Sequence, residues 1–199
     1  MKVIKQMSGI ERRVVMEGKR IIVLVGPSGS GKTTLGEELS KKGYPKLVTT
    51  TTRNERQGEI DGVDYYFRNK KDLNPDNFVE QTIYNDNLYG LTKAEVQNAL
   101  IQHPIVHVSL DKNGAKAMQT VYPEETFVVF VHVSEEEMKK RMRARGDKDS
   151  KISERITFSQ TIDELKPPET ADLIIENKVV EDSVEKILGA LSDVNQKAE

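Results

Sequence analysis

Apolar runs of strand length alternate with longer helix-favouring segments along much of this chain. The run at residues 20–25 is rich in β-branched side chains and stops at Gly26, which is typical of a strand buried on both faces of a parallel sheet. Further apolar runs that predict strands occupy residues 105–110, 127–133 and 173–175. Segments that predict helices occupy residues 32–42, 113–121, 135–145 and 182–191. This alternation predicts a parallel sheet covered by helices.

The chain between residues 46 and 91 has a different pattern. Residues 46–52 predict another strand, whereas residues 54–64 are polar and carry glycines, which is typical of a loop. Short aromatic and β-branched runs predict small strands at residues 65–67, 78–79 and 82–84. This region therefore predicts a small antiparallel insert.

Two predicted helices begin with the same four-residue pattern. Thr92 precedes Glu95, and Ser134 precedes Glu137, by the three positions of a capping box. In that motif each side chain binds the other residue's free backbone N–H, so both helices have a defined start. Pro104 marks the end of the first helix, at about residue 102.

Composition excludes several classes of protein. The 199 residues include 30 basic and 32 acidic ones, and a formal net charge of -2 gives no broad positive field for nucleic acid. The absence of cysteine excludes disulfide frameworks, cysteine-ligated metals and thiol nucleophiles. His103, His107 and His132 have no metal-ligand spacing, so we interpret them as structural or surface residues.

The apolar runs are too short to cross a bilayer. A spanning helix needs about 20 apolar residues, and the longest runs here have the length of strands. Residues 1–19 lack the apolar core of a signal peptide and predict an exposed arm. We therefore expect a cytoplasmic protein without membrane partners, whose oligomeric state the sequence leaves unknown.

A glycine-rich turn joins the first strand to the first helix. Residues 26–33 match the pattern G-x-x-x-x-G-K-[ST] in the strand–turn–helix context that this pattern requires. Backbone N–H groups and the helix N-terminus would hold phosphates, Lys32 would reach the β- and γ-phosphates, and the Thr33 hydroxyl would bind Mg²⁺. The loop by itself leaves ATPase, GTPase and kinase activity open.

Two arginines follow, three residues apart in the predicted loop. Arg53 and Arg56, with Tyr65 beyond them, can hold one phosphate dianion through bidentate hydrogen bonds. The stretch from residue 51 to residue 67 resembles the signature of guanylate kinases, with its paired threonines, two arginines, glutamate, glycine and Tyr-x-Phe at the family's spacing. The resemblance covers roughly residues 20–195.

The resemblance implies a reaction and two sets of binding residues. The reaction is Mg²⁺-dependent phosphoryl transfer from ATP to GMP or dGMP, giving ADP and GDP. Glu80 would accept hydrogen bonds from the ring N–H and the exocyclic amine of guanine, worth about 1.5–3 kcal/mol each, and adenine lacks that edge. The implied GMP-binding residues are Thr49, Arg53, Arg56, Glu59, Tyr65, Glu80, Tyr89, Gly90 and Asp111. The implied ATP-binding residues are Gly26, Pro27, Ser28, Gly29, Ser30, Gly31, Lys32, Thr33, Thr34 and Asn177.

Besides Arg68 at the edge of the signature, two positions depart from the family pattern. Leu91 stands where Ser or Thr is usual and cannot donate to guanine O6, a loss of about 0.5–1.5 kcal/mol. Ser109 stands where many members carry Asp, which removes a charge that would support Lys32 or Mg²⁺. We therefore expect the preference for guanine to survive with a lower affinity.

Asp111 and Asn177 each have two interpretations. Asp111 follows an apolar strand, as a metal-binding carboxylate would, and it also precedes a helix, as an N-cap does. Asn177 lies in an element that resembles the family's contact with the ATP adenine, and an asparagine after a strand is also a common turn residue. The sequence does not separate these alternatives.

Basic residues gather at the end of the helix predicted at residues 135–145. The lysines there and Arg143 fit a solvent-exposed helix face. Arg141, Arg145 and, after a Gly-Asp-Lys-Asp-Ser loop, Arg155 resemble the family's lid, in which arginines stabilise charge on the transferred phosphoryl group. With Lys32 they are the candidate catalytic residues.

Together these features predict an α/β protein with the three-layer P-loop NTPase fold, a parallel core sheet, an antiparallel acceptor-binding insert and a lid. The predicted parts are an arm (1–19), core (20–52), GMP-binding insert (53–91), core (92–140), lid (141–158) and core (159–199). Two alternatives remain open: an inactive module of this family that binds phosphorylated partners, and a related kinase for another small phosphate. The intact phosphate loop argues against the first, and Glu80 argues against the second.

Overall fold

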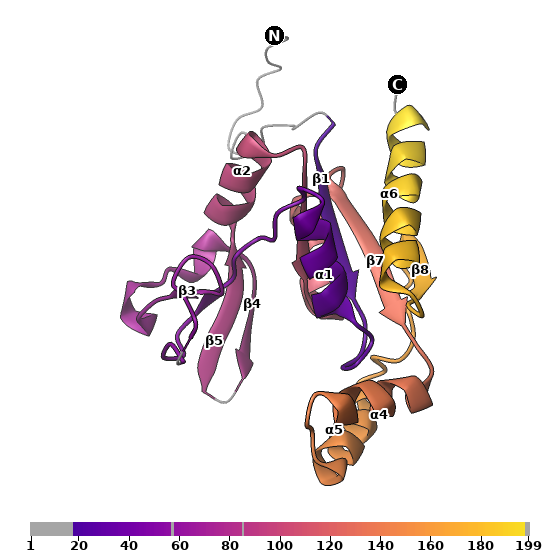
Figure 1. The fold of residues 1–199 in the computed structure, drawn as a ribbon. Helices are drawn as coiled ribbons and strands as arrows, with labels where there is room; N and C mark the ends of the chain where they lie inside the picture. The colour runs from indigo at the N-terminus through magenta and orange to yellow at the C-terminus, as the bar shows by residue number, and fades with distance from the viewer. Residues whose placement is uncertain (1–17, 57, 85, 198–199) are drawn as a thin grey trace.

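The structure is a computed structural model that describes residues 18–56, 58–84 and 86–197 (Figure 1). The predicted N-terminal arm lies outside the described residues, apart from Gly18 and Lys19. Two sheets and six helices make up the described part of the chain.

Four parallel strands form the central sheet, in the order β6-β1-β7-β8. They are β1 Arg20–Val25, β6 Ile105–Ser109, β7 Thr126–His132 and β8 Leu173–Glu176. Residues 21–25 are at most 1% exposed, because β1 has a strand on each side and helices over both faces. The predicted parallel sheet with a fully buried strand is confirmed.

Helices cover both faces of this sheet and complete three layers. The helices are α1 Lys32–Lys41, α2 Lys93–Gln102, α3 Lys112–Val121, α4 Glu135–Ala144, α5 Asp149–Thr161 and α6 Val180–Lys197. Apolar side chains of α1 and α6 share one core cluster with the sheet, and those of α2 and α3 share the other. Within the described residues, we find no helix with the length and hydrophobicity needed to cross a membrane.

Helix α5 corrects the sequence analysis. We expected a flexible loop at residues 146–150, but Asp149 and Ser150 form the first turn of α5. The low hydropathy of this segment hid the helix, since only Ile152, Ile156 and Ser159 are buried along it. Helices α4 and α5 pack together through a small apolar cluster and project from the sheet as an arm.

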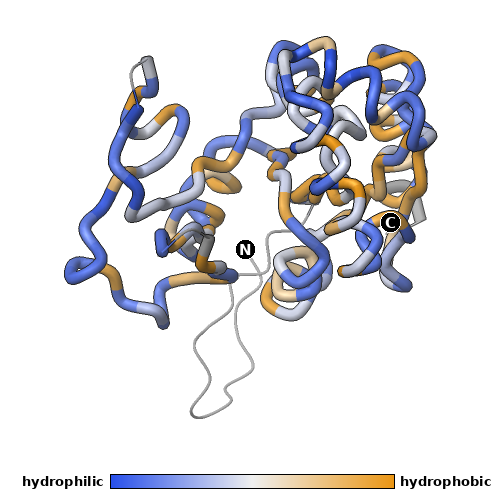
Figure 2. The backbone as a smooth tube through the Cα atoms, turned by 90° about the horizontal axis from the view of Figure 1, so that it is seen from below, coloured by the Kyte–Doolittle hydropathy of each residue, from blue (hydrophilic) through white to orange (hydrophobic). Residues whose placement is uncertain are grey.

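The insert is a second sheet in the order β3-β2-β5-β4. Its strands are β2 Thr50–Thr51, β3 Tyr66–Phe67, β4 Phe78–Tyr84 and β5 Asn87–Thr92, with short 3₁₀ turns η1 Lys70–Asp72 and η2 Pro75–Asn77. The sheet is mixed and not antiparallel throughout as predicted, because β2 and β3 run parallel while β5 pairs antiparallel with β2 and β4. Figure 2 shows mostly hydrophilic chain in this part, whereas hydrophobic segments gather in the core.

Three details of the insert were predicted wrongly. The strand expected at residues 46–52 is reduced to β2 and one isolated pairing of Lys46 with His107. The runs at 78–79 and 82–84 form one strand, because Glu80 and Gln81 between them also pair with β5, after a register shift between Phe78 and Glu80. Strand β5, which the sequence analysis did not predict, closes a hairpin with β4.

Both capping boxes form only in part. Thr92 accepts a hydrogen bond from the Glu95 backbone N–H, and Ser134 accepts one from the Glu137 N–H, each at 3.2 Å. The two glutamates bind elsewhere: Glu95 accepts from the Val48 N–H and the Tyr66 hydroxyl, and Glu137 accepts from an arginine one turn later. Glu95 therefore ties the insert to α2 instead of completing the cap.

The positions of the insert and the α4–α5 arm define where a site can form. The carboxyl ends of β1 and β7 point toward the space between the insert and the α4–α5 arm (Figure 1). Ligands of open α/β sheets bind at this edge, because loops and helix N-termini converge there.

Candidate functional site

The phosphate loop lies at the carboxyl end of β1, and its backbone requires glycine. Gly31 precedes α1 with φ +98°, and a Cβ at this residue would lie 2.3 Å from the Asn177 amide nitrogen. Any larger residue would therefore meet both conformational strain and a steric clash. Because α1 begins at Lys32, the free N–H groups of its first turn point into the loop.

A cavity of about 790 Å³ opens between the phosphate loop and the α4 arm. We call it the donor cavity. Six of the nine predicted loop residues line it: Ser28, Gly29, Gly31, Lys32, Thr33 and Thr34. Three other predicted residues also line it: Arg141, Arg145 and Asn177. Gly26 faces a different cavity, and Ser30 is fully buried.

Lys32 connects the donor cavity to its neighbour. Its Nζ donates to the carbonyl oxygens of Gly26 and Pro27, the second at 3.0 Å, so the side chain lies folded over the loop. Burial lowers the pKa of Lys32, while the negative charge of Glu164 raises it. Lys32 lines both this cavity and the acceptor cavity described next.

The second cavity has a volume of about 290 Å³ and lies between the insert and the strand ends. We call it the acceptor cavity. Six of the nine residues predicted for the acceptor line it: Thr49, Tyr65, Glu80, Tyr89, Gly90 and Asp111. Thr82 and Glu164 also line it, and the sequence analysis singled out neither. Thr82 follows Glu80 by two positions on the same strand, a spacing that would have revealed it, whereas no local signal pointed to Glu164.

The three remaining acceptor residues form a cluster in the loop before β3. Both terminal nitrogens of Arg53 bind the Glu59 carboxylate, at 2.9 and 2.8 Å, and Glu59 also accepts from the Arg56 N–H. This ion pair raises the pKa of Arg53 and lowers that of Glu59. The Arg53 guanidinium also lies over the Tyr65 ring, 5.4 Å from its centre. The Glu59 carboxylate is thus occupied by the arginine loop itself.

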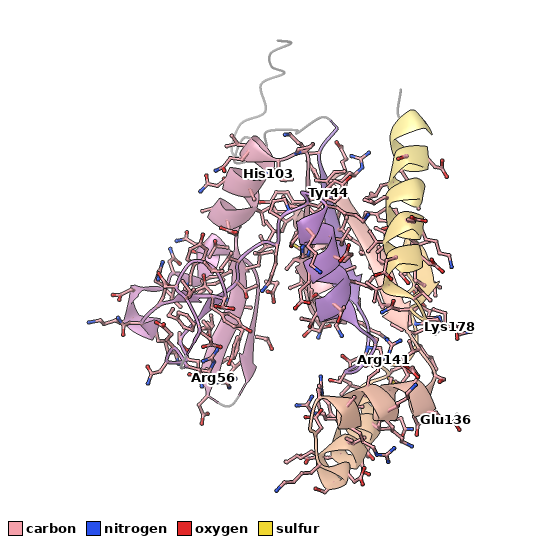
Figure 3. All side chains as sticks on the ribbon, viewed as in Figure 1. Tyr44, Arg56, His103, Glu136, Arg141 and Lys178 are labelled. Atoms are coloured by element: carbon pink, nitrogen blue, oxygen red, sulfur yellow. The ribbon has the colours of Figure 1, made fainter. Side chains whose placement is uncertain are left out.

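The tyrosines link this arginine loop to the acceptor cavity. Tyr65 and Tyr89 meet edge to face with ring centres 5.9 Å apart, and both rings line the cavity. Arg56 is exposed on the insert, whereas Arg141, on α4, lies beside the phosphate loop (Figure 3).

Among the acidic groups that line the acceptor cavity, Glu80 has a pKa well above its ordinary value. Burial is the main cause that raises its pKa to about 7, and the nearby charge of Asp111 adds to the shift. Asp111 accepts a hydrogen bond from the Gly114 N–H at 2.7 Å, which confirms its interpretation as the N-cap of α3. The metal-binding interpretation of Asp111 stays a prediction.

Leu91 does not line the acceptor cavity. Its side chain is fully buried in the core cluster that contains Val79, Val96 and Val108. The departure at this position therefore contributes to core packing, and any direct effect on a bound base would require the strand to move.

The candidate lid arginines have different surroundings. Arg141 donates to the Ser30 and Asn177 carbonyls and to Glu137, so it holds α4 against the phosphate loop. Arg145 lines the donor cavity and pairs with Asp147 at 2.5 Å. Arg155 is exposed on α5, outside both cavities.

Asn177 has a structural role in this arrangement. It is fully buried, its amide nitrogen donates to the Ser30 carbonyl at 2.9 Å, and its amide oxygen accepts from the Ser183 hydroxyl at 3.0 Å. Both ends of the amide are thus bound to protein groups. Asn177 positions the phosphate loop, and its contact with a base stays a prediction.

The oxygen donor set at the loop fits a magnesium ion held with phosphates. Thr33 is exposed in the first turn of α1 and lines the donor cavity, and Mg²⁺ usually takes few protein ligands beside phosphate oxygens and water. Across the described ranges, no three His, Asp or Glu side chains converge as a metal site. His107 is buried against Ser40, and this burial lowers its pKa to about 4, as expected of a structural histidine.

The sequence comparisons with known proteins agree on one family. The sequence model for guanylate kinase matches residues 18–194. A guanylate kinase of Clostridioides difficile is 35% identical over 184 residues, covering 89% of each chain, and one of Wolinella succinogenes is 36% identical over 176 residues, covering 84% of this chain and 80% of its own. The crystal structure of guanylate kinase from Anaplasma phagocytophilum matches with a TM-score of 0.61 at 24% identity, covering 88% of this chain and 85% of that chain, which shows a shared fold.

Proposed function

This chain belongs to the guanylate kinase family, and we propose that it transfers the γ-phosphoryl group of ATP to GMP, giving ADP and GDP. The observation that carries the proposal is that Lys32 lines both cavities, one with a phosphate loop and one with a half-buried glutamate. A phosphoryl group would therefore pass beside Lys32 from the first cavity to the second.

The donor cavity binds ATP with Mg²⁺. The N–H groups of the loop and the first turn of α1 hold the phosphates, and Lys32 turns from the Gly26 and Pro27 carbonyls toward the β- and γ-phosphates. Thr33 would hold Mg²⁺ together with phosphate oxygens, and the ion would neutralise charge on the phosphates. Arg141 already holds α4 at the loop, and Arg145 lines the same cavity.

The acceptor cavity binds GMP by its two ends. Arg53 and Arg56 hold the phosphate. Because Glu59 already fixes the Arg53 guanidinium, GMP binding loses little side-chain entropy at this residue. Tyr65 and Tyr89 add hydroxyl groups at the same end. The ionised Glu80 accepts from the ring N–H and the exocyclic amine of guanine at the other end, and adenine would leave this carboxylate unpaired.

Catalysis comes from positioning and charge, since no residue needs to form a covalent intermediate. The insert and the α4–α5 arm would close over the phosphate loop and bring Arg155 toward the transferred group. Closure also excludes water, which would otherwise accept the phosphoryl group and hydrolyse ATP.

The experiment measures ADP release from Mg·ATP with GMP, dGMP, AMP, CMP and UMP as separate acceptors and a blank without acceptor. We expect rapid turnover with GMP and little above the blank with AMP. Equal rates with GMP and AMP, or no turnover with any nucleotide, would contradict the proposal. Binding of Mg·ATP without turnover would point to another small phosphate as acceptor.

A further inference from the structure

Glu164 is an acidic group at the acceptor cavity with no role so far. It follows α5, in the segment that leads from the α4–α5 arm back to β8, and it lines the cavity together with Lys32. The negative charge of Glu164 raises the pKa of Lys32, which burial lowers.

The turn that carries Glu164 is held from two sides. The Ser159 hydroxyl donates to the Glu164 carboxylate at 2.7 Å, and the Glu164 N–H donates to the Ser159 carbonyl at 2.8 Å. Lys112, at the start of α3, donates to the Asp163 carbonyl and lies 3.8 Å from its carboxylate. Asp163 has φ +55°, a conformation that is unfavourable outside glycine and persists only where the surroundings impose it. These contacts hold the Glu164 turn at the cavity that Lys32 also lines.

The last residue of the neighbouring strand carries no charge. In P-loop enzymes an aspartate at the end of an adjacent strand commonly supports the metal and phosphate site. Here β6 lies beside β1 and ends in the neutral Ser109, which is paired with Leu24 and lines the acceptor cavity. Asp111, two residues later, caps α3.

We propose that Glu164 is a positioning residue for Lys32, supplying from the arm the negative charge that the neutral Ser109, at the end of β6, lacks. The carboxylate draws the ammonium from the loop carbonyls toward the phosphates between the two cavities. Lys32 is therefore correctly placed only when the arm is docked. This inference rests on the proposed function, because it concerns the lysine of the same transfer site.

The first test compares Glu164→Gln with Glu169→Gln, a matched loss of charge at an exposed residue of the same connecting segment. We expect Glu164→Gln to lower kcat about 10–100-fold, as the loss of an outer-shell partner does, with both KM values within about threefold of wild type. Glu169→Gln should leave kcat unchanged, and Glu164→Asp should retain more activity than the Gln variant.

The second test asks whether charge at this place is the cause. Adding Ser109→Asp to Glu164→Gln should recover kcat at least severalfold, because it restores a carboxylate beside Lys32. Ser159→Ala, which frees the Glu164 carboxylate, should lower kcat less than Glu164→Gln and serves in its place if that variant fails to fold. Unchanged kcat in Glu164→Gln and Ser159→Ala would overturn the inference. So would a loss of kcat in Glu169→Gln equal to that in Glu164→Gln, or no recovery when Ser109→Asp is added to Glu164→Gln.

A third measurement does not depend on the acceptor. The chain has no cysteine, so Lys32→Cys combined with Glu164→Cys introduces its only two thiols. We expect dibromobimane to cross-link them, and not the pair Lys32→Cys with Glu169→Cys. Absence of the first cross-link refutes the placement of Glu164. If the cross-link forms but the wild-type protein does not phosphorylate GMP, only the proposed function is refuted.

Discussion

The ionisation of Glu80 gives the most direct test of the acceptor site. Burial and the charge of Asp111 raise its pKa from 4.5 to about 7, so half of the free protein carries a neutral Glu80 at neutral pH. Only the ionised carboxylate can accept from both guanine donors. GMP binding therefore favours ionised Glu80, and acidification should weaken it.

The size of the effect follows from the pKa. A rise from 4.5 to about 7 corresponds to about 3 kcal/mol less stability for the ionised form. If GMP binds only the ionised form, the titration of Glu80 alone raises KM for GMP above its high-pH limit about 11-fold at pH 6, about twofold at pH 7 and about 1.1-fold at pH 8. The KM for ATP should not follow this curve, because Glu80 does not line the donor cavity.

Steady-state kinetics between pH 5.5 and 8.5 would measure this, with two variants as controls. Asp111→Asn removes the like charge and still caps α3, so the midpoint of the GMP curve should move to lower pH. Glu80→Gln should abolish the Glu80 component and leave only the titration of the GMP phosphate, whose second pKa is about 6. A wild-type midpoint that neither variant alters would refute this assignment of Glu80.

Three further outcomes are expected. Lys32→Ala should abolish transfer to GMP while the protein stays folded by circular dichroism, and undiminished turnover would contradict the role of the phosphate loop. Glu59→Gln should raise KM for GMP about tenfold with little change in kcat, because Arg53 loses the bidentate partner that holds it; an unchanged KM in the same kinetic assay would show that this ion pair is dispensable. Leu91→Thr should lower the free energy of unfolding in urea by about 2–4 kcal/mol without improving GMP affinity, because the position is fully buried; tighter GMP binding would show that it reaches the base.

The features that the sequence alone determined are local ones. The phosphate loop could be located because its glycines and Lys32 lie close together, within residues 26–33, and follow a β-branched run. Both features depend on neighbouring residues only. The helix starts at Thr92 and Ser134 were equally accessible, since an N-cap acts within one turn.

The tertiary structure decided what each side chain contacts across long separations in the chain. Glu95 completes no capping box, because folding brings the Val48 N–H and the Tyr66 hydroxyl to its carboxylate. Asn177 is bound to Ser30, 147 positions away, and thereby positions the phosphate loop. Glu164 lines the same cavity as Lys32 only because the chain returns from the α4–α5 arm to the sheet at that point. Periodicity encodes which face of an element is buried, but a polar partner is selected by packing, and packing depends on the whole chain at once.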